Sequence, residues 1–134
     1  SDVAVIGCGA YGANAFAASM EAGKLTRIPA ASSIITCIGA EIVTPRIMEL
    51  SKTHNLGAYL TSDLRAVEAC ERFLDDHRLL VDPSCGVSLA ALYENTPLLG
   101  NAKTVVSIVC GGVGIKLAKL RRMRLLAEQK NELH

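Results

Sequence analysis

Short apolar runs alternate with longer segments of helical periodicity along this chain, and the alternation limits the folds it can adopt. Val3–Ile6 and Gly57–Leu60 are two such runs, and each precedes a helical pattern. Thr104–Val109 reads Thr-Val-Val-Ser-Ile-Val and predicts the clearest buried strand, ahead of a helix over 115–129. Strands that alternate with helices predict an α/β fold with a three-layer, open and mainly parallel sheet.

Capping residues predict where several helices begin and end. Gly23 is a typical residue for the end of a helix over 13–22. Thr44 and Pro45 suit the start of a helix that runs to about residue 54, with the threonine as the N-cap. Ser62 begins a segment with a strong apolar face, so we expect another helix there.

A second group of expectations concerns packing and minor elements. Residues 84–95 are dense in small side chains, which predicts a helix that packs closely against a neighbour. Residues 95–102 have the composition of a loop. We also expect a short helix from Ser32 and Ser33 to Ile38, and a strand at 40–43.

Length and composition narrow the class of protein. The 134 residues, 50% of them apolar, suffice for a core and for one domain at most. Fourteen basic residues balance 13 acidic ones and Trp is absent, which argues against a nucleic-acid-binding domain. No apolar run approaches the ~18–20 residues of a membrane helix, and no signal peptide is evident. We therefore expect a cytoplasmic protein that binds neither nucleic acid nor membranes.

The cysteines favour the same compartment. The odd number and the absence of a Cys-x-x-Cys pair fit neither a disulfide framework nor a zinc site. Each cysteine lies in an apolar stretch, so we expect reduced, buried thiols. The five are Cys8, Cys37, Cys70, Cys85 and Cys110.

A first glycine motif, Gly7–Gly12, has the pattern Gly-x-Gly-x-x-Gly after the first predicted strand. In that context the motif can hold a dinucleotide pyrophosphate at the start of a helix. The mechanism also needs an acidic residue about 20 positions further on, and none occurs before Glu41. The alternatives are a dinucleotide site and a closely packed turn.

A second glycine motif, Cys110–Gly114, follows the strand predicted at Thr104–Val109. Ligands of open α/β sheets bind at the carboxyl ends of strands, where glycines free backbone N–H groups to face them. By spacing alone the motif favours a structural turn with a buried cysteine over a ligand site, because many turns of α/β proteins have the same pattern.

Two segments carry a resemblance to a known family. Residues 80–93, Leu-Val-Asp-Pro-Ser-Cys-Gly-Val-Ser-Leu-Ala-Ala-Leu-Tyr, resemble the segment Val-Glu-Pro-Ala-Cys-Gly-Ala-Ala-Leu-Ala-Ala-Val-Tyr of mammalian-type L-serine dehydratases. Residues 107–120 resemble the segment Val-Val-Ile-Val-Cys-Gly-Gly-Ser-Asn-Ile-Ser-Leu-Ala-Gln-Leu of the same family. Residues 22–29, 33–40 and 73–76 match in the same order, so the resemblance covers nearly the whole chain and the C-terminal part of the family's length.

The resemblance implies a pyridoxal-phosphate enzyme of the tryptophan-synthase-β fold type. Such enzymes eliminate water and ammonia from L-serine to give pyruvate, and from L-threonine to give 2-oxobutanoate. Residues 1–134 would be a single partial domain, the C-terminal part of the cofactor-binding large domain. The full-length enzyme would be a homodimer of amino-acid catabolism whose small-molecule partner is its amino-acid substrate.

The resemblance also assigns cofactor contacts. Cys110 matches the cysteine whose sulfur lies beside the pyridine nitrogen, and Gly111 follows it. A neutral thiol is a weak hydrogen-bonding partner that does not force a proton onto that nitrogen as a carboxylate would. Ala40 falls near the small residue that packs on one face of the ring.

Several family features have no counterpart among these residues. The Schiff-base lysine of a Ser-x-Lys motif lies upstream in the family, as does the four-glycine run that holds the cofactor phosphate. None of the six lysines here has that context, so no catalytic residue is assigned to this chain. Since the chain also begins at Ser1 rather than Met, we expect a fragment that is inactive alone.

A monovalent-cation site is also affected. The family pattern Glu-Thr-x-Gly-Ala-x-Ser reads Gly-Ala-Tyr-Gly-Ala-Asn-Ala here, which puts Gly9 in place of the glutamate and Ala15 in place of the serine. The Ala13 carbonyl remains a candidate ligand for K⁺, but the carboxylate that would charge the site is lost. These changes leave open a second interpretation, a dehydratase-like binding or regulatory module that has lost catalysis.

Overall fold

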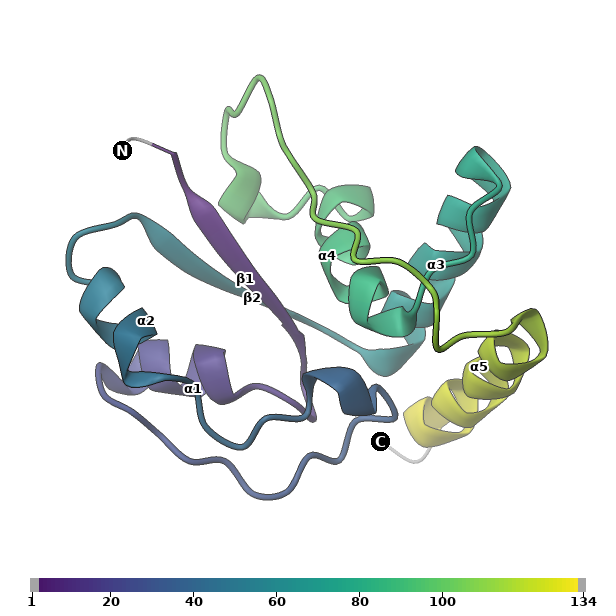
Figure 1. The fold of residues 1–134 in the computed structure, drawn as a ribbon, viewed down its shortest axis with the longest axis horizontal. Helices are drawn as coiled ribbons and strands as arrows, with labels where there is room; N and C mark the ends of the chain where they lie inside the picture. The colour runs from purple at the N-terminus through teal and green to yellow at the C-terminus, as the bar shows by residue number, and fades with distance from the viewer. Residues whose placement is uncertain (1–2, 133–134) are drawn as a thin grey trace.

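Two parallel strands, β1 (Val5–Ala10) and β2 (Leu56–Thr61), form the sheet in the computed structural model, which describes residues 3–132 (Figure 1). Val5 lies opposite Leu56, and the pairing continues without a bulge to Ala10 opposite Thr61. A parallel pair needs a long crossover, because both strands must run in the same direction. Here the crossover contains α1 (Ala15–Ala22), the 3₁₀ turn η1 (Thr36–Ile38) and α2 (Pro45–Leu50).

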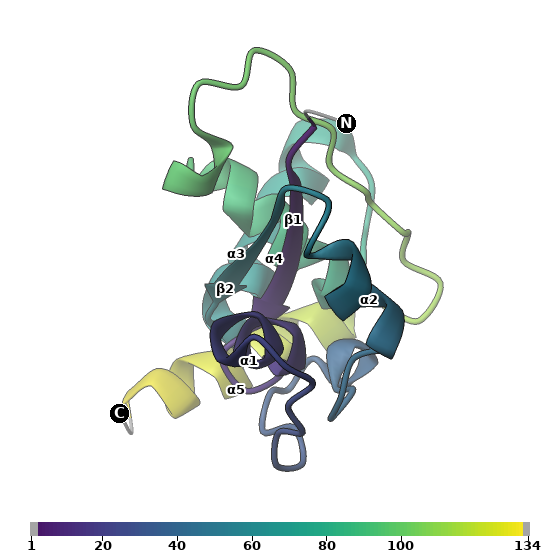
Figure 2. The same cartoon turned by 90° about the vertical axis from the view of Figure 1, so that its left-hand side faces the viewer.

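Helices cover both faces of this sheet. Helix α1 packs against both strands on one side, and α4 (Pro83–Tyr93) packs against both strands on the other (Figures 1 and 2). Helix α3 (Asp63–His77) lies against α4, and α5 (Leu117–Glu132) lies against α3. A short 3₁₀ turn, η2 (Pro97–Leu99), follows α4. The predicted α/β class and its three layers are confirmed.

The capping signals in the sequence mark real helix ends. The Ser62 hydroxyl accepts a hydrogen bond of 3.1 Å from the Arg65 N–H and so satisfies a free donor at the start of α3. Gly23 ends α1 in the left-handed conformation, with φ of 65°. Thr44 precedes α2 with Pro45 in its first turn, but the helix ends at Leu50, earlier than predicted.

Helices α3 and α4 approach each other unusually closely at Gly86. A Cβ atom on Gly86 would lie 2.1 Å from the Ala66 carbonyl oxygen and 2.8 Å from the Cys70 sulfur. Only glycine fits at position 86, which confirms the predicted close packing of this helix against a neighbour. The core beside this contact contains buried side chains from β2, α3, α4 and α5, among them Tyr59, Val67, Leu89 and Leu120.

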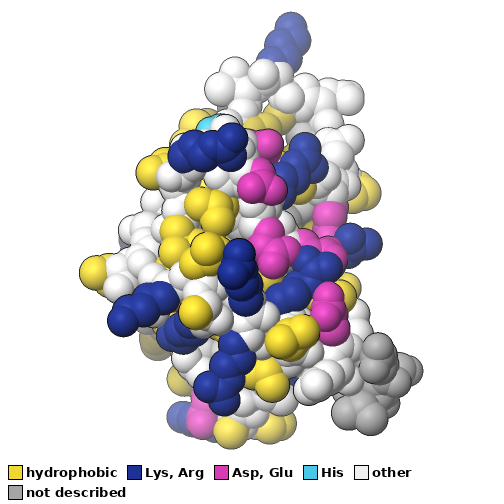
Figure 3. Space-filling view, turned by 90° about the vertical axis from the view of Figure 1, so that its right-hand side faces the viewer, with side chains coloured by type: hydrophobic (Ala, Val, Ile, Leu, Met, Phe, Trp, Pro, Cys, Tyr) yellow, Lys and Arg dark blue, Asp and Glu magenta, His cyan; other side chains and the backbone are white. Residues whose placement is uncertain are grey.

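Arg124 joins α5 to α3. Its guanidinium contacts Glu71 at 2.5 Å, Glu68 at 3.2 Å and, within α5, Glu128 at 2.6 Å. These carboxylates raise the pKa of Arg124 above its ordinary value, with the Glu128 hydrogen bond the largest cause. Figure 3 shows the side of the molecule on which α3 and α5 lie, where acidic and basic side chains are interspersed.

The segment Thr104–Val109 is the main error of the sequence-based prediction. It is extended and lies along α4, where the Ser88 hydroxyl donates to the Ile108 carbonyl at 3.3 Å, but it is not paired in the sheet. Val106 is 84% exposed. Within residues 3–132, Ser107 carries the one buried side-chain polar atom without a hydrogen-bond partner. A strand is defined by hydrogen bonds to a partner strand, and among residues 3–132 the sheet pairs only β1 with β2.

Smaller expectations also fail. The strand predicted at 40–43 is irregular, and the helix expected to reach Ile38 is only the turn η1. The first strand begins at Val5 and extends to Ala10, four residues beyond its predicted end. All five cysteines are free thiols, but only Cys70 and Cys85 are buried, Cys8 is partly buried, and Cys37 and Cys110 are exposed.

We predict that Gly86→Ala lowers the free energy of unfolding by about 1–3 kcal/mol, the usual cost of overpacking a dense contact. The added methyl group would meet the Ala66 carbonyl, which belongs to the backbone of α3 and cannot turn away. Urea denaturation measures the change. Gly57→Ala is the control, because its Cβ would meet only the Leu98 Cδ2 atom at an ordinary 3.8 Å. Equal losses in the two variants would contradict the packing argument.

A second prediction concerns pH. The buried Tyr59 hydroxyl donates to the Glu94 carboxylate at 2.5 Å, and burial together with this bond raises the pKa of Tyr59 to about 12. The folded state therefore holds this proton more tightly than the unfolded state does. The associated stability is fully present below pH ~10 and is lost as pH rises toward 12. Unfolding free energy measured from pH 9 to 12 should fall less steeply in Tyr59→Phe; an unchanged slope would refute the assignment.

Candidate functional site

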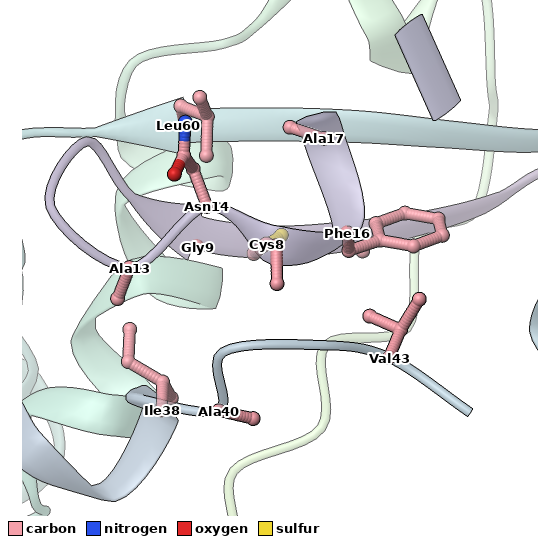
Figure 4. Close-up of a pocket in the computed structure, with 12 residues that line it drawn as sticks. Cys8, Gly9, Ala13, Asn14, Phe16, Ala17, Ile38, Ala40, Val43 and Leu60 are labelled. Carbon is pink, nitrogen blue, oxygen red and sulfur yellow. The ribbon is translucent and has the colours of Figure 1, made fainter. Parts of the chain in front are cut away.

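A cavity of about 120 Å³ lies where β1 and α1 meet the crossover segment (Figure 4). One side is formed by β1 and the start of α1, and the other by the last residue of η1 and residues that follow it. Ile38, Ala40 and Val43 of the crossover face Cys8 and Phe16 across the gap. The complete lining is Gly7, Cys8, Gly9, Ala13, Asn14, Ala15, Phe16, Ala17, Ile38, Ala40, Val43 and Leu60.

The lining is small and mostly apolar. Its polar side chains are the amide of Asn14 and the thiol of Cys8, and burial raises the pKa of that thiol. No lysine, carboxylate or histidine lines the cavity. Asn14 is the N-cap of α1, yet its side chain makes no capping hydrogen bond. A cavity of about 120 Å³ is well below the ~300 Å³ at which small-molecule pockets begin. By itself it is too small to enclose a cofactor, so these residues can form only part of a binding site.

The predicted cofactor contacts fall in two places. Ala40 lines the cavity, whereas Cys110 and Gly111 do not. Gly111 has φ of 120°, a conformation that favours glycine. Its carbonyl accepts from the Asp82 N–H at 3.0 Å and from the Cys85 thiol at 3.4 Å, so the start of α4 holds this turn in place. The Cys110 side chain beside it is exposed.

Ala13, the predicted cation ligand, lies next to Gly9, one of the two positions where the family's ligands are lost. Ala13 donates its N–H to the Ala10 carbonyl at 2.8 Å, which folds the chain back after β1. A Cβ atom on Gly9 would lie 3.0 Å from the Ala13 carbonyl oxygen. A side chain at position 9 would therefore be in tight contact with that oxygen, and the turn after β1 would have to shift by a few tenths of an ångström to accept it. Ala15 is 5% exposed and lines the same cavity.

The dinucleotide interpretation of Gly7–Gly12 is not supported by this geometry. Gly7 and Gly9 lie inside β1, paired with Ala58 and Leu60. A dinucleotide motif needs its glycines in the turn between strand and helix, where their N–H groups face the pyrophosphate. The strand continues through the motif because its backbone is paired with β2.

Sequence reasoning missed most of the lining. Cys8, Asn14, Phe16, Ile38 and Val43 were assigned no role, because apolar side chains in a cavity follow no pattern that separates them from core residues. The missing N-cap bond of Asn14 is visible only in three dimensions.

Among the described residues, no helix has the length and hydropathy to cross a bilayer, and no three metal-ligating side chains converge.

Comparison with known proteins gives a consistent result. The family of pyridoxal-phosphate dependent enzymes matches residues 1–111. The L-serine dehydratase/L-threonine deaminase of Homo sapiens is 38% identical over 140 residues, covering 98% of this chain and 43% of the human protein. Its Bos taurus counterpart is 40% identical over 127 residues, covering 89% and 39%. The chain thus spans about two-fifths of the length of the curated relatives it matches.

Solved structures resemble the fold over nearly the same extent. A fungal L-serine ammonia-lyase from Rhizomucor miehei superposes with a TM-score of 0.84 at 35% identity, covering 94% of this chain and 42% of the fungal one. Maize serine racemase superposes with a TM-score of 0.76 at 20% identity, covering 92% and 40%, which shows a shared fold. The fold type expected from the resemblance is confirmed.

Proposed function

Since the chain belongs to the family of pyridoxal-phosphate dependent enzymes, we propose that it is the C-terminal part of an L-serine and L-threonine ammonia-lyase. Two observations carry the proposal. The chain is 38% and 40% identical to proteins named L-serine dehydratase/L-threonine deaminase, and it superposes on a fungal L-serine ammonia-lyase at 35% identity. Residues 1–134 would form a single partial domain. The whole protein would be a cytoplasmic homodimer that acts on small amino acids in their catabolism.

The residues of this chain fit one side of a pyridoxal-phosphate site. Gly9, Ala13 and Ala40 leave space where larger side chains would fill it, and Cys110 presents a free thiol from a turn anchored on α4. A lysine for covalent attachment does not line the cavity. When bound, pyridoxal phosphate withdraws electrons from the α-carbon of the substrate.

The proposed roles of the residues follow from their chemistry. The Cys110 thiol would lie beside the pyridine nitrogen as a neutral partner and leave that nitrogen without a full positive charge. Gly111 would hold the thiol in position through the bonds that its carbonyl accepts from α4. Ala40 would pack on one face of the ring. The β-elimination that this supports yields pyruvate from serine and 2-oxobutanoate from threonine.

A second candidate function is a binding or regulatory module that has lost catalysis. It is favoured by Gly9 and Ala15, because neither can supply the carboxylate or hydroxyl oxygen that a hard cation requires. Ala13 alone would offer a carbonyl oxygen, which is a weak site for K⁺.

The test joins this chain to the N-terminal portion of the Rhizomucor miehei enzyme. We predict that the chimera releases pyruvate from L-serine, whereas this chain alone does not and gains no cofactor mass after borohydride reduction. Cys110→Ala should lower kcat of the chimera about five- to tenfold, the factor that matches roughly 1 kcal/mol for one hydrogen bond. Cys37→Ala, another exposed cysteine outside the cavity lining, is the matched control.

The outcomes separate the two candidates. A chimera that folds and binds the cofactor but releases no pyruvate contradicts the ammonia-lyase proposal. If Gly9→Glu combined with Ala15→Ser then restores pyruvate release in a K⁺-dependent manner, loss of the cation site explains the inactivity and the second candidate stands.

A further inference from the structure

Asp63 is a buried carboxylate at the first residue of α3. Its side chain is 6% exposed, which is rare for an acidic residue without compensating partners. One oxygen accepts from the Ser33 hydroxyl at 2.5 Å. The other accepts from the Ile34 N–H at 3.1 Å and from the Lys130 ammonium at 2.9 Å. The carboxylate therefore joins three segments that are far apart in the sequence.

Lys130 comes from the C-terminal end of α5. Besides Asp63, its ammonium donates to the Ser32 carbonyl at 2.7 Å. One cation thus binds both the start of α3 and the crossover segment, 67 and 98 positions away in the chain. The side chain is 36% exposed, so water screens these bonds only in part.

The segment held by these bonds leads directly to the cavity. The Ser33 hydroxyl accepts from the Ile35 N–H at 3.0 Å, and the Ser32 N–H donates to the Gly12 carbonyl at 2.9 Å, just before Ala13. Ile34, Ile35 and Ile38 pack with Ala10, Ala66, Val87 and the partly buried Cys8 in one cluster. Displacement of residues 32–35 would therefore move the crossover side of the cavity, formed by Ile38, Ala40 and Val43, which faces Cys8. We call this side the wall.

We infer that Lys130 and Asp63 form a latch, through which the C-terminal helix holds the crossover segment closed over the cavity. Both are positioning residues that act through Ser32, Ser33 and Ile34. The latch goes beyond the proposed function, because it rests on contacts within the chain and requires neither cofactor nor substrate.

A general loss of stability must be separated from local opening, and the cysteines allow this. Cys8 is partly buried and lines the cavity, whereas Cys70 and Cys85 are fully buried between α3 and α4 and do not line it. Opening of the latch exposes Cys8 alone. Global unfolding exposes all three.

The experiment is pulsed iodoacetamide labelling of this chain, with the rate at each cysteine read by peptide mass spectrometry. We predict that Lys130→Met raises the labelling rate of Cys8 roughly tenfold, the factor that corresponds to about 1.4 kcal/mol, with Cys70 and Cys85 unchanged. Lys130→Arg should keep the slow rate, because the guanidinium can still donate to Asp63 and Ser32. The labelling rate of the exposed Cys110 corrects for changes in reagent reactivity.

Lys119→Met is the matched control. Lys119 lies on the same helix and donates to the Gly114 carbonyl at 3.2 Å, away from the cavity. Asp63→Asn, which removes the charge and keeps only one acceptor oxygen, should raise Cys8 labelling and abolish the further effect of Lys130→Met. The inference is overturned if Cys8 is unaffected by Lys130→Met, if all three cysteines accelerate together, or if Lys119→Met has the same effect.

Discussion

The close approach of α4 to α3 at Gly86 is the contact on which most of the structure depends. It lets α4 pack on the sheet with one side and against α3 with the other. Side chains from the sheet and from three helices are therefore buried together in one core cluster. The start of α4 then holds the Gly111 carbonyl through Asp82 and Cys85, and Ser88 holds the extended segment at Ile108. The position of the Cys110 turn is a consequence of how closely two helices can pack.

The extended segment Thr104–Val109 is the least satisfied part of the fold. Its sequence has strand character, yet Val106 and Ile108 are largely exposed and the buried Ser107 hydroxyl is unpaired. Backbone groups of such a segment need a neighbouring strand. The chain spans about two-fifths of the length of the relatives it matches. If it is part of a larger domain, as we propose, residues outside this sequence would provide the neighbouring strand.

Local signals in the sequence predicted the fold where local chemistry decides it. Ser62 and Gly23 mark helix ends because capping involves only nearby residues, and Pro45 marks the start of α2 through its fixed backbone angle, without a capping bond from the Thr44 side chain. Thr104–Val109 was predicted wrongly because strand formation depends on a partner that the pattern does not reveal. The extent of β1 was missed for the opposite reason: pairing with β2 carries the strand through two glycines that suggested a turn.

The candidate site was predictable only in part. Ala40, Ala13 and Gly9 came from the resemblance, and the structure brings them to one cavity, while Cys110 and Gly111 lie outside its lining. Cys8, Phe16 and Val43 could not be found, because their side chains are those of any core. The contact between Asp63 and Lys130 joins positions 67 residues apart and has no trace in the sequence pattern.

Amide hydrogen exchange over 104–109 measures whether this segment belongs to a larger sheet that other residues of the whole protein complete. We expect rapid exchange in the chain alone and strong protection once the N-terminal portion of the fungal enzyme is joined to it, with β1 amides protected in both. Protection of 104–109 in the chain alone, or continued rapid exchange in a folded chimera, would contradict it.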